Sequence, residues 1–154
     1  MSNKIIDGKL ISSEIREKVK KFGDQLKSKT GKVPGLAVVL VGENPASRVY
    51  VRNKIEKTTE VGFNSIEHKL SEKVSENELI DLVDKLNNDE NVQGILVQLP
   101  LPEHVNSDKI LDRIKPEKDV DGFHANNVGK LWSGLNSLVP CTPLGLSLIH
   151  IWRC

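Results

Sequence analysis

Two short, almost uninterrupted apolar runs constrain the fold of this chain more than any other feature. They are Leu36-Ala-Val-Val-Leu-Val41 and Gly94-Ile-Leu-Val-Gln-Leu99. Runs of this length, rich in branched side chains, favour strands that are covered on both faces, as in a parallel sheet. A weaker, alternating run at residues 65–70 predicts a third strand nearer the sheet edge. Leu, Ile and Val must fill the core, because aromatic residues make up only 4% of the chain.

Amphipathic stretches of helical length separate these runs. In residues 9–29, apolar side chains recur mostly at spacings of three and four, which predicts a helix with one apolar face. The side chains on that face are Leu10, Ile11, Ile15, Val19, Phe22 and Leu26. Gly31 and Pro34 then break the pattern before the first predicted strand.

Three further helices are predicted from their end signals. Asn44 can cap a helix and Pro45 suits its first position, so a second helix is expected from there to about Gly62. Residues 75–78 read Ser-Glu-Asn-Glu, a capping-box spacing that opens a third helix. A short fourth helix is expected near residues 107–114, with Leu111 pointing inward. The apolar face of the third helix is predicted to be Leu79, Ile80, Val83 and Leu86.

The order of these elements predicts the fold class. Helices and strands alternate along the chain, which favours an α/β fold: a three-layer α/β/α sandwich with a mostly parallel sheet. In open sheets of this kind, ligands bind beyond the carboxyl ends of the strands. Residues 41–44 and 98–102 follow the first and third predicted strands, and residues 118–124 are expected to reach the same rim. A functional site is therefore expected where these three segments meet.

Tyr50 and Lys54 lie four residues apart in the second predicted helix, so they share one face. A phenol ring can stack on a flat substrate, and an amine can move a proton. Taken alone, a helical lysine is more often a solvated surface group. The Tyr-x-x-x-Lys spacing of short-chain dehydrogenases is no guide here, because no Gly-x-Gly-x-x-Gly loop precedes it.

Gln98 and Asp121 are the other candidate site residues. Gln98 closes an otherwise apolar run, where its amide could orient a substrate, steady Lys54, or satisfy backbone groups at the strand end. Asp121 could accept a hydrogen bond from an amino-pyrimidine ring, or belong to an ordinary Asp-Gly turn with Gly122. His124 is expected to be structural. No set of His, Cys and carboxylate residues has metal-ligand spacing, so no metal is predicted.

Composition excludes several classes of partner. The chain has 22 Lys and Arg against 21 Asp and Glu, a net charge of +1 that gives no support for nucleic-acid or membrane binding. No stretch of 18 apolar residues is present, so no membrane span is expected. The two cysteines, Cys141 and Cys154, lie near one end and form no disulfide framework. These features predict a soluble cytoplasmic protein.

Four motifs, taken together and in order, resemble the bifunctional methylenetetrahydrofolate dehydrogenase/methenyltetrahydrofolate cyclohydrolase family. They occupy residues 34–54, 94–102, 115–124 and 140–145, and the resemblance covers about residues 5–145. The second motif reads Gly-Ile-Leu-Val-Gln-Leu-Pro-Leu-Pro, and the third reads Lys-Pro-Glu-Lys-Asp-Val-Asp-Gly-Phe-His. Four ordered motifs of this length make a chance match very improbable.

The resemblance implies an activity in one-carbon metabolism and purine biosynthesis. It implies oxidation of 5,10-methylenetetrahydrofolate to 5,10-methenyltetrahydrofolate with NADP, then hydrolysis to 10-formyltetrahydrofolate. Lys54 would be the general acid and base, Tyr50 would stack on the folate, and Gln98 would hold Lys54. Asp121 would bind the pterin edge. The implied pocket lining is Val97, Leu99 and Pro100, and the residue implied near the nicotinamide is Thr142.

The last nine residues depart from the family pattern. Residues 1–145 are expected to form the folate-binding catalytic domain, and residues 146–154 a tail outside the family pattern. Our hypothesis is that this tail is an artefact, since residues 146–151 back-translate to CTG TCT CTT ATA CAC ATC, a common transposase-adapter end. A continuous genomic read encoding the tail would refute that hypothesis; the alternative is a genuine truncated gene.

The sequence also lacks the phosphate-binding loop of a nucleotide domain. Dehydrogenase activity is therefore not expected from this chain alone, and an apolar patch is expected where a second domain would pack. Three alternatives stay open: a folate-binding module without catalysis, an inactive fragment, and a parent enzyme with dehydrogenase activity only. The choice between NADP and NAD also stays open. A homodimer is the family expectation for the full-length parent.

Overall fold

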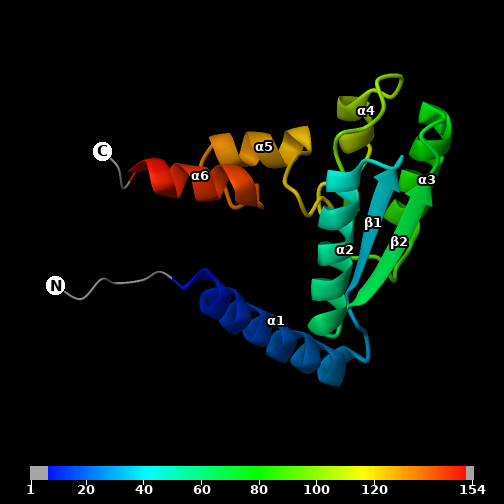
Figure 1. Cartoon of the computed structure of the whole chain (residues 1–154). Coiled ribbons are helices and arrows are strands. Elements are labelled where there is room, and N and C mark those ends of the chain that lie inside the picture. The colour runs from blue at the N-terminus through cyan, green and yellow to red at the C-terminus, as the bar shows by residue number, and fades with distance from the viewer. Residues whose placement is uncertain (1–6, 152–154) are drawn as a thin grey trace.

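A three-stranded parallel sheet lies at the centre of the computed structural model, which describes residues 7–151 (Figure 1). Its strands are β1 (Gly35–Val41), β2 (Asn64–Leu70) and β3 (Gly94–Val97), in the order β2-β1-β3. The central strand β1 pairs with both neighbours and is buried along almost all its length. β2 is an edge strand with alternating exposure. The predicted α/β fold with a parallel sheet is confirmed.

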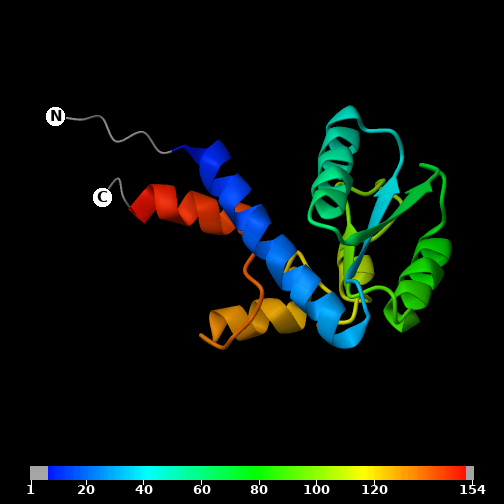
Figure 2. The same ribbon diagram turned by 90° about the horizontal axis from the view of Figure 1, so that it is seen from below.

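Helices cover both faces of this sheet. α2 (Pro45–Glu60) packs on one face, and α3 (Glu76–Asn88) and α4 (Ser107–Leu111) pack on the other. Figure 2 shows α2 and α3 on opposite sides of the strands. The smaller core cluster, under α2, is formed by Val38, Leu40, Val51 and Leu96. The larger cluster on the other face includes Val39, Leu79, Ile95, Val97 and Ile110.

The predicted capping signals set the starts of α2 and α3. The Asn44 side chain accepts a hydrogen bond from the Ser47 N–H at 3.1 Å, and Pro45 occupies the first turn of α2. At α3, the Ser75 and Glu78 side chains each accept from the other's backbone N–H, which is a capping box. α2 ends at Glu60, slightly before the position predicted for its end.

The strand that leads to the expected site is shorter than predicted. β3 ends at Val97 rather than at Leu99. The Gln98 N–H still donates to the Val39 carbonyl at 2.9 Å, but the side-chain amide of Gln98 donates to the Leu99 carbonyl at 2.7 Å. The next residue, Pro100, has no N–H to continue the ladder. The ladder therefore stops where the side chain of Gln98 becomes part of the rim.

The fourth helix also differs in detail from the prediction. α4 ends at Leu111, three residues earlier than expected. Ile110 and Ile114 are fully buried in the larger core cluster, whereas Leu111 is only partly buried and packs against it. The residues that point inward are therefore Ile110, within α4, and Ile114, just after the helix, rather than Leu111.

The first helix is present as predicted but is not covered. α1 (Gly8–Thr30) begins after Asp7, whose carboxylate accepts two backbone N–H groups. No residue of α1 is buried, and the helix extends away from the sandwich in both views (Figures 1 and 2). The exposed apolar side chains are Leu10, Ile11, Ile15, Val19, Phe22 and Leu26.

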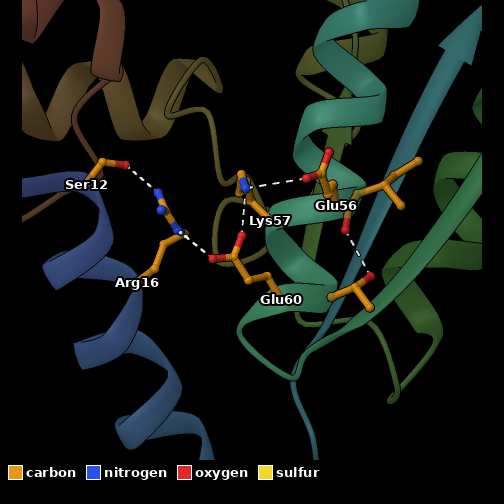
Figure 3. A network of polar contacts seen from close by, with 7 residues as sticks. Ser12, Arg16, Glu56, Lys57 and Glu60 are labelled. Atoms are coloured by element: carbon orange, nitrogen blue, oxygen red, sulfur yellow. Dashed lines mark hydrogen bonds and ion pairs between the residues drawn. The ribbon is translucent and has the colours of Figure 1, made fainter. Parts of the chain in front are cut away.

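A polar network connects α1 to the end of α2 (Figure 3). Arg16 donates to Ser12 and pairs with Glu60 at 3.0 Å, and Lys57 pairs with Glu60 at 2.7 Å and with Glu56 at 3.5 Å. The hydrogen bond from Lys57, and then that from Arg16, lowers the pKa of Glu60. Only the Arg16–Glu60 pair joins the two helices in this network, and exposed ion pairs of this kind contribute little to stability.

Two further helices follow the sandwich. They are α5 (Ala125–Trp132) and α6 (Cys141–Ile151). α6 runs across the domain boundary expected at residue 145, so that boundary stays a prediction. Among residues 7–151, no helix has the length and apolar character that crossing a membrane requires.

The exposed apolar side chains of α1 predict self-association. Ile15 is 54% exposed and Phe22 is 69% exposed, so replacing both with Gln should leave the thermal midpoint nearly unchanged. Removing two large apolar side chains should lower the association constant at least about tenfold. Sedimentation velocity over a range of concentrations measures this, with Lys20→Gln on the same helix as the control. Equal association of the double variant and the wild type would contradict the prediction.

Candidate functional site

The centre of the candidate site is a contact between Lys54 and Gln98. Lys54 Nζ, from the middle of α2, donates a hydrogen bond to Gln98 Oε1 over 3.3 Å. Gln98 Nε2 donates to the Leu99 carbonyl at 2.7 Å, and the Gln98 N–H donates to the Val39 carbonyl. The backbone bond fixes the main chain at Gln98, and the bond from Nε2 orients the amide so that its oxygen faces Lys54. The geometry joins two residues that lie 44 positions apart in the sequence.

Asp121 reaches this pair from the third expected segment. The Lys118 carbonyl accepts from the Ile95 N–H at 2.7 Å, and Asp119 forms a parallel bridge with Ile95, so the segment runs alongside β3. Burial raises the pKa of Asp121; the positive charge of Lys54 opposes this shift and the negative charge of Asp119 adds to it. Within residues 7–151 the Asp121 carboxylate accepts no protein hydrogen bond, so its oxygens can accept from a ligand.

Tyr50 lies one turn before Lys54 on α2. Its side chain is 62% exposed, so the ring has an open face for a flat ligand. Leu99 is partly buried and Pro100 is exposed, which leaves both accessible where the chain leaves β3. Of the predicted site residues, the structure thus brings together Lys54, Gln98 and Asp121, with Tyr50 one turn from Lys54.

Three other residues lie apart from this group. Val97 is 2% exposed, and its side chain belongs to the larger core cluster, on the sheet face opposite α2. Its side chain points away from α2, since successive strand residues point to opposite faces, and its predicted place in the pocket lining stays a prediction. Thr142 is exposed in the first turn of α6. His124 Nδ1 accepts from the Asn126 N–H at 3.0 Å and so caps α5. This is a structural role, the kind expected of His124.

The sequence interpretation did not assign a role to Asp119. This residue is only 2% exposed, and it accepts hydrogen bonds from the backbone of Gly122 and His124. It thus occupies the turn position that had been considered for Asp121. The motif shows two aspartates two positions apart before a glycine, but not which of the two is buried.

A hollow on the other flank of α2 is a weaker candidate. It is lined by Leu40, Pro45, Arg48, Val49, Arg52, Ile55, Glu67 and Lys69. Two of its cations are already paired, Arg48 with Glu43 at 2.9 Å and Lys69 with Glu67 at 3.2 Å. Arg52 is thus its one cation without an ion-pair partner among residues 7–151. In the part of the chain that the structure describes, no group of three or more His, Cys, Asp or Glu residues could hold a metal ion.

Replacing Asp121 with Asn is expected to stabilise the chain at neutral pH. Because burial raises the pKa of Asp121 in the folded state, that state binds the proton more tightly than the unfolded chain does. The contribution of Asp121 to stability therefore falls as the pH rises from its ordinary pKa through the raised one. The variant should be more stable by about 0.5–2 kcal/mol at neutral pH, and equal to the wild type in acid.

Urea unfolding of both proteins across this pH range measures the difference. Asp108→Asn, an exposed carboxylate on α4, is the control. A variant less stable than the wild type at neutral pH would contradict the prediction.

Comparisons with known proteins agree on one family. The family model described as tetrahydrofolate dehydrogenase/cyclohydrolase, catalytic domain, matches residues 6–121. Bifunctional protein FolD 1 of Roseobacter denitrificans is 55% identical over 145 residues, which are 94% of this chain and 48% of that protein. The chain thus spans about half the length of the curated relatives it matches.

Solved structures show the same likeness. The bifunctional FolD methylenetetrahydrofolate dehydrogenase/cyclohydrolase of Campylobacter jejuni has a TM-score of 0.86 at 49% identity, covering 96% of this chain and 52% of its own. The Trypanosoma brucei enzyme, solved with NADP cofactor and inhibitor, has a TM-score of 0.87 at 33% identity, covering 97% and 51%.

Proposed function

The chain belongs to the tetrahydrofolate dehydrogenase/cyclohydrolase family, and we propose that it forms the folate-binding catalytic half of a bifunctional enzyme. The whole enzyme would oxidise 5,10-methylenetetrahydrofolate to 5,10-methenyltetrahydrofolate and hydrolyse that product to 10-formyltetrahydrofolate. The observation that carries the proposal is the Lys54–Gln98 hydrogen bond of 3.3 Å, with Asp121 close enough for the charge of Lys54 to lower its pKa. An amine, a fixed amide and a free carboxylate suit acid–base chemistry on a nitrogen-rich ring.

Lys54 is the proton carrier of the hydrolysis. The neutral amine takes one proton from a water molecule while the water oxygen forms a bond to the methenyl carbon. The bond from that carbon to N5 then breaks, Lys54 gives its proton to N5, and the formyl group stays on N10. The second proton of the water is released as the formyl C=O forms. Because Gln98 Oε1 accepts a hydrogen from Nζ, the lone pair of the neutral amine stays available to a water molecule.

The other residues bind and orient the folate. Tyr50 offers an exposed ring on which the flat part of the folate stacks. Asp121 accepts hydrogen bonds from the amino group and ring N–H of the pterin edge. Leu99 and Pro100 form a wall beside them. A burial-raised pKa at Asp121 means that the carboxylate gains from such donors, which favour its ionised form.

For the whole protein we propose NADP as the hydride acceptor, the cofactor held by the Trypanosoma brucei relative. When bound, a nicotinamide ring takes the hydride of the methylene carbon. The described residues of this chain supply no nucleotide phosphate loop, since the sequence contains no Gly-x-Gly-x-x-Gly pattern. Thr142, exposed on α6, would lie near the nicotinamide in the whole protein. Hydride transfer is therefore assigned to the whole protein. We also propose a homodimer for it, and a cytoplasmic location, which suits the free, exposed thiol of Cys141.

Hydrolysis of methenyltetrahydrofolate by this chain tests the proposal. The loss of the substrate's near-ultraviolet absorbance is followed with and without protein, and tetrahydrofolate binding is measured by calorimetry on the same sample. The expected result is binding, together with hydrolysis faster than the spontaneous reaction. A folded sample that neither binds tetrahydrofolate nor accelerates the hydrolysis would refute the proposed function for this chain.

A further inference from the structure

Asp119 is a buried carboxylate that the proposed chemistry does not use. It is 2% exposed, and none of the ion pairs among residues 7–151 includes it. Its two oxygens accept three hydrogen bonds, from the Gly122 N–H at 3.0 Å, the His124 N–H at 2.9 Å and Asn127 Nδ2 at 2.9 Å. All three donors are neutral N–H groups. Such a set holds both carboxylate oxygens in one orientation, because each oxygen accepts at least one of these hydrogen bonds.

These bonds fix the loop that carries Asp121. The two backbone donors, Gly122 and His124, lie just beyond Asp121 in the chain, so Asp119 draws the loop back over itself. Gly122 has a φ of 72°, the left-handed conformation that glycine adopts without strain. The direction in which Asp121 leaves the loop is therefore set by Asp119 on one side and by Gly122 on the other.

The same group ties the loop to its neighbours. Asn127 Nδ2 donates to the Pro116 carbonyl at 2.8 Å as well as to Asp119, which joins α5 to the start of the segment. On the other side, the bridge between Asp119 and Ile95 attaches the segment to β3, the strand that leads to Gln98. Asp119 thus lies between the two elements that must keep their spacing if Asp121 is to face Lys54.

We infer that Asp119 is a positioning residue, which holds the 119–124 loop so that Asp121 faces Lys54 and the folate without touching the ligand itself. This inference rests on the proposed function for its consequence in binding. Its geometric part, the placing of Asp121, stands on the hydrogen bonds alone.

The negative charge of Asp119 provides a second readout, the pKa of Asp121, which a purely structural role of Asp119 would not affect. The charged groups that act on Asp121 are Lys54, from α2, and Asp119, from the same loop. Asp119 raises the pKa of Asp121, so Asp119→Asn should lower it. The pH below which folate binding is lost should then be lower in the variant than in the wild type. The affinity at neutral pH should nevertheless fall, because the loop has shifted.

The experiment compares Asp119→Asn with the wild type in two measurements. The first is an NMR titration without ligand, which follows the carbon-13 signal of the Asp121 carboxyl and the N–H signal of the Gly122 amide. The second is calorimetric binding of tetrahydrofolate at a series of pH values. The expected results are a lower pKa for Asp121, a moved Gly122 amide signal, and an affinity at neutral pH lower by about tenfold or more. Asp112→Asn removes the charge of a carboxylate that accepts from the Ala125 N–H at the start of α5, but keeps an oxygen that can accept, so it should change none of the three.

Asn127→Ala keeps the test decisive if Asp119→Asn does not fold. It removes one donor but leaves the charge, so the affinity should fall by a smaller factor and the pH below which folate binding is lost should not change. The inference would be overturned if Asp119→Asn left both the Asp121 titration and the Gly122 signal unchanged. It would also be overturned if Asn127→Ala left the affinity unchanged. Shifted NMR signals in a chain that binds no tetrahydrofolate would support the positioning and refute the proposed function.

Discussion

Replacing Lys54 with methionine is expected to slow methenyltetrahydrofolate hydrolysis by about 10²–10⁴-fold, the usual contribution of a positioned proton carrier. Methionine keeps the unbranched stem of the side chain but cannot take a proton from water. Lys54 is only partly buried, and its one protein hydrogen bond among the described residues is the 3.3 Å contact with Gln98. The free energy of unfolding should therefore hardly change, and the loss should lie in the rate.

Lys57→Met is the matched control for this experiment. Lys57 lies on the same helix but is exposed and pairs with Glu60 and Glu56, away from Gln98. Its replacement should leave the hydrolysis rate within about twofold of the wild type, as for most surface substitutions. Equal rates for Lys54→Met and the wild type would show that another group moves the proton. Equal losses in both variants would point to a general disturbance of α2.

The strands and helix ends could be predicted because their signals are local. The branched apolar runs became β1 and β3, and the alternating run became the edge strand β2. Asn44 and Ser75 cap the helices whose starts they predicted, since a capping hydrogen bond spans only three residues. Local patterns of this kind need no knowledge of what lies across the sheet.

Exposure could not be predicted in the same way. The periodicity of α1 shows that the helix has an apolar face, but not that a neighbour covers that face. Likewise, Leu96 and Val97 look equivalent in the sequence, yet they belong to different core clusters on opposite sides of the sheet. Which of them faces α2 depends on the register of β3 against β1, which is a property of the assembled sheet.

The candidate site shows the same division between local and long-range information. The pairing of Tyr50 with Lys54 follows from helical spacing alone. That Gln98 could steady Lys54 was one of several interpretations of a polar residue closing an apolar run, and the hydrogen bond between them is present. The separate roles of Asp119 and Asp121 could not be predicted, because the bridge to Ile95 decides which carboxylate is buried.

Replacing Leu79 with alanine should lower the free energy of unfolding by about 2–5 kcal/mol, the range for a leucine removed from a packed core. Leu79 is 0% exposed on α3 and lies in the larger core cluster with Val83 and Ile95. The capping box of Ser75 and Glu78 is untouched, so the helix still begins at the same residue. The loss should therefore come from the cavity and the lost burial, and it should appear as a lower urea midpoint with little change in slope.

Ile80→Ala on the same helix is the control, because Ile80 is only partly buried and should lose less. Circular dichroism is the suitable probe, since Trp132 is 93% exposed and reports little on the core. A loss no greater for Leu79→Ala than for Ile80→Ala would contradict the packing of α3 against the sheet. Leu79 lies on the opposite sheet face from α2, so hydrolysis per folded molecule should stay near the wild-type rate. The two substitutions, at Leu79 and at Lys54, would thus separate what holds the sandwich together from what acts on the substrate.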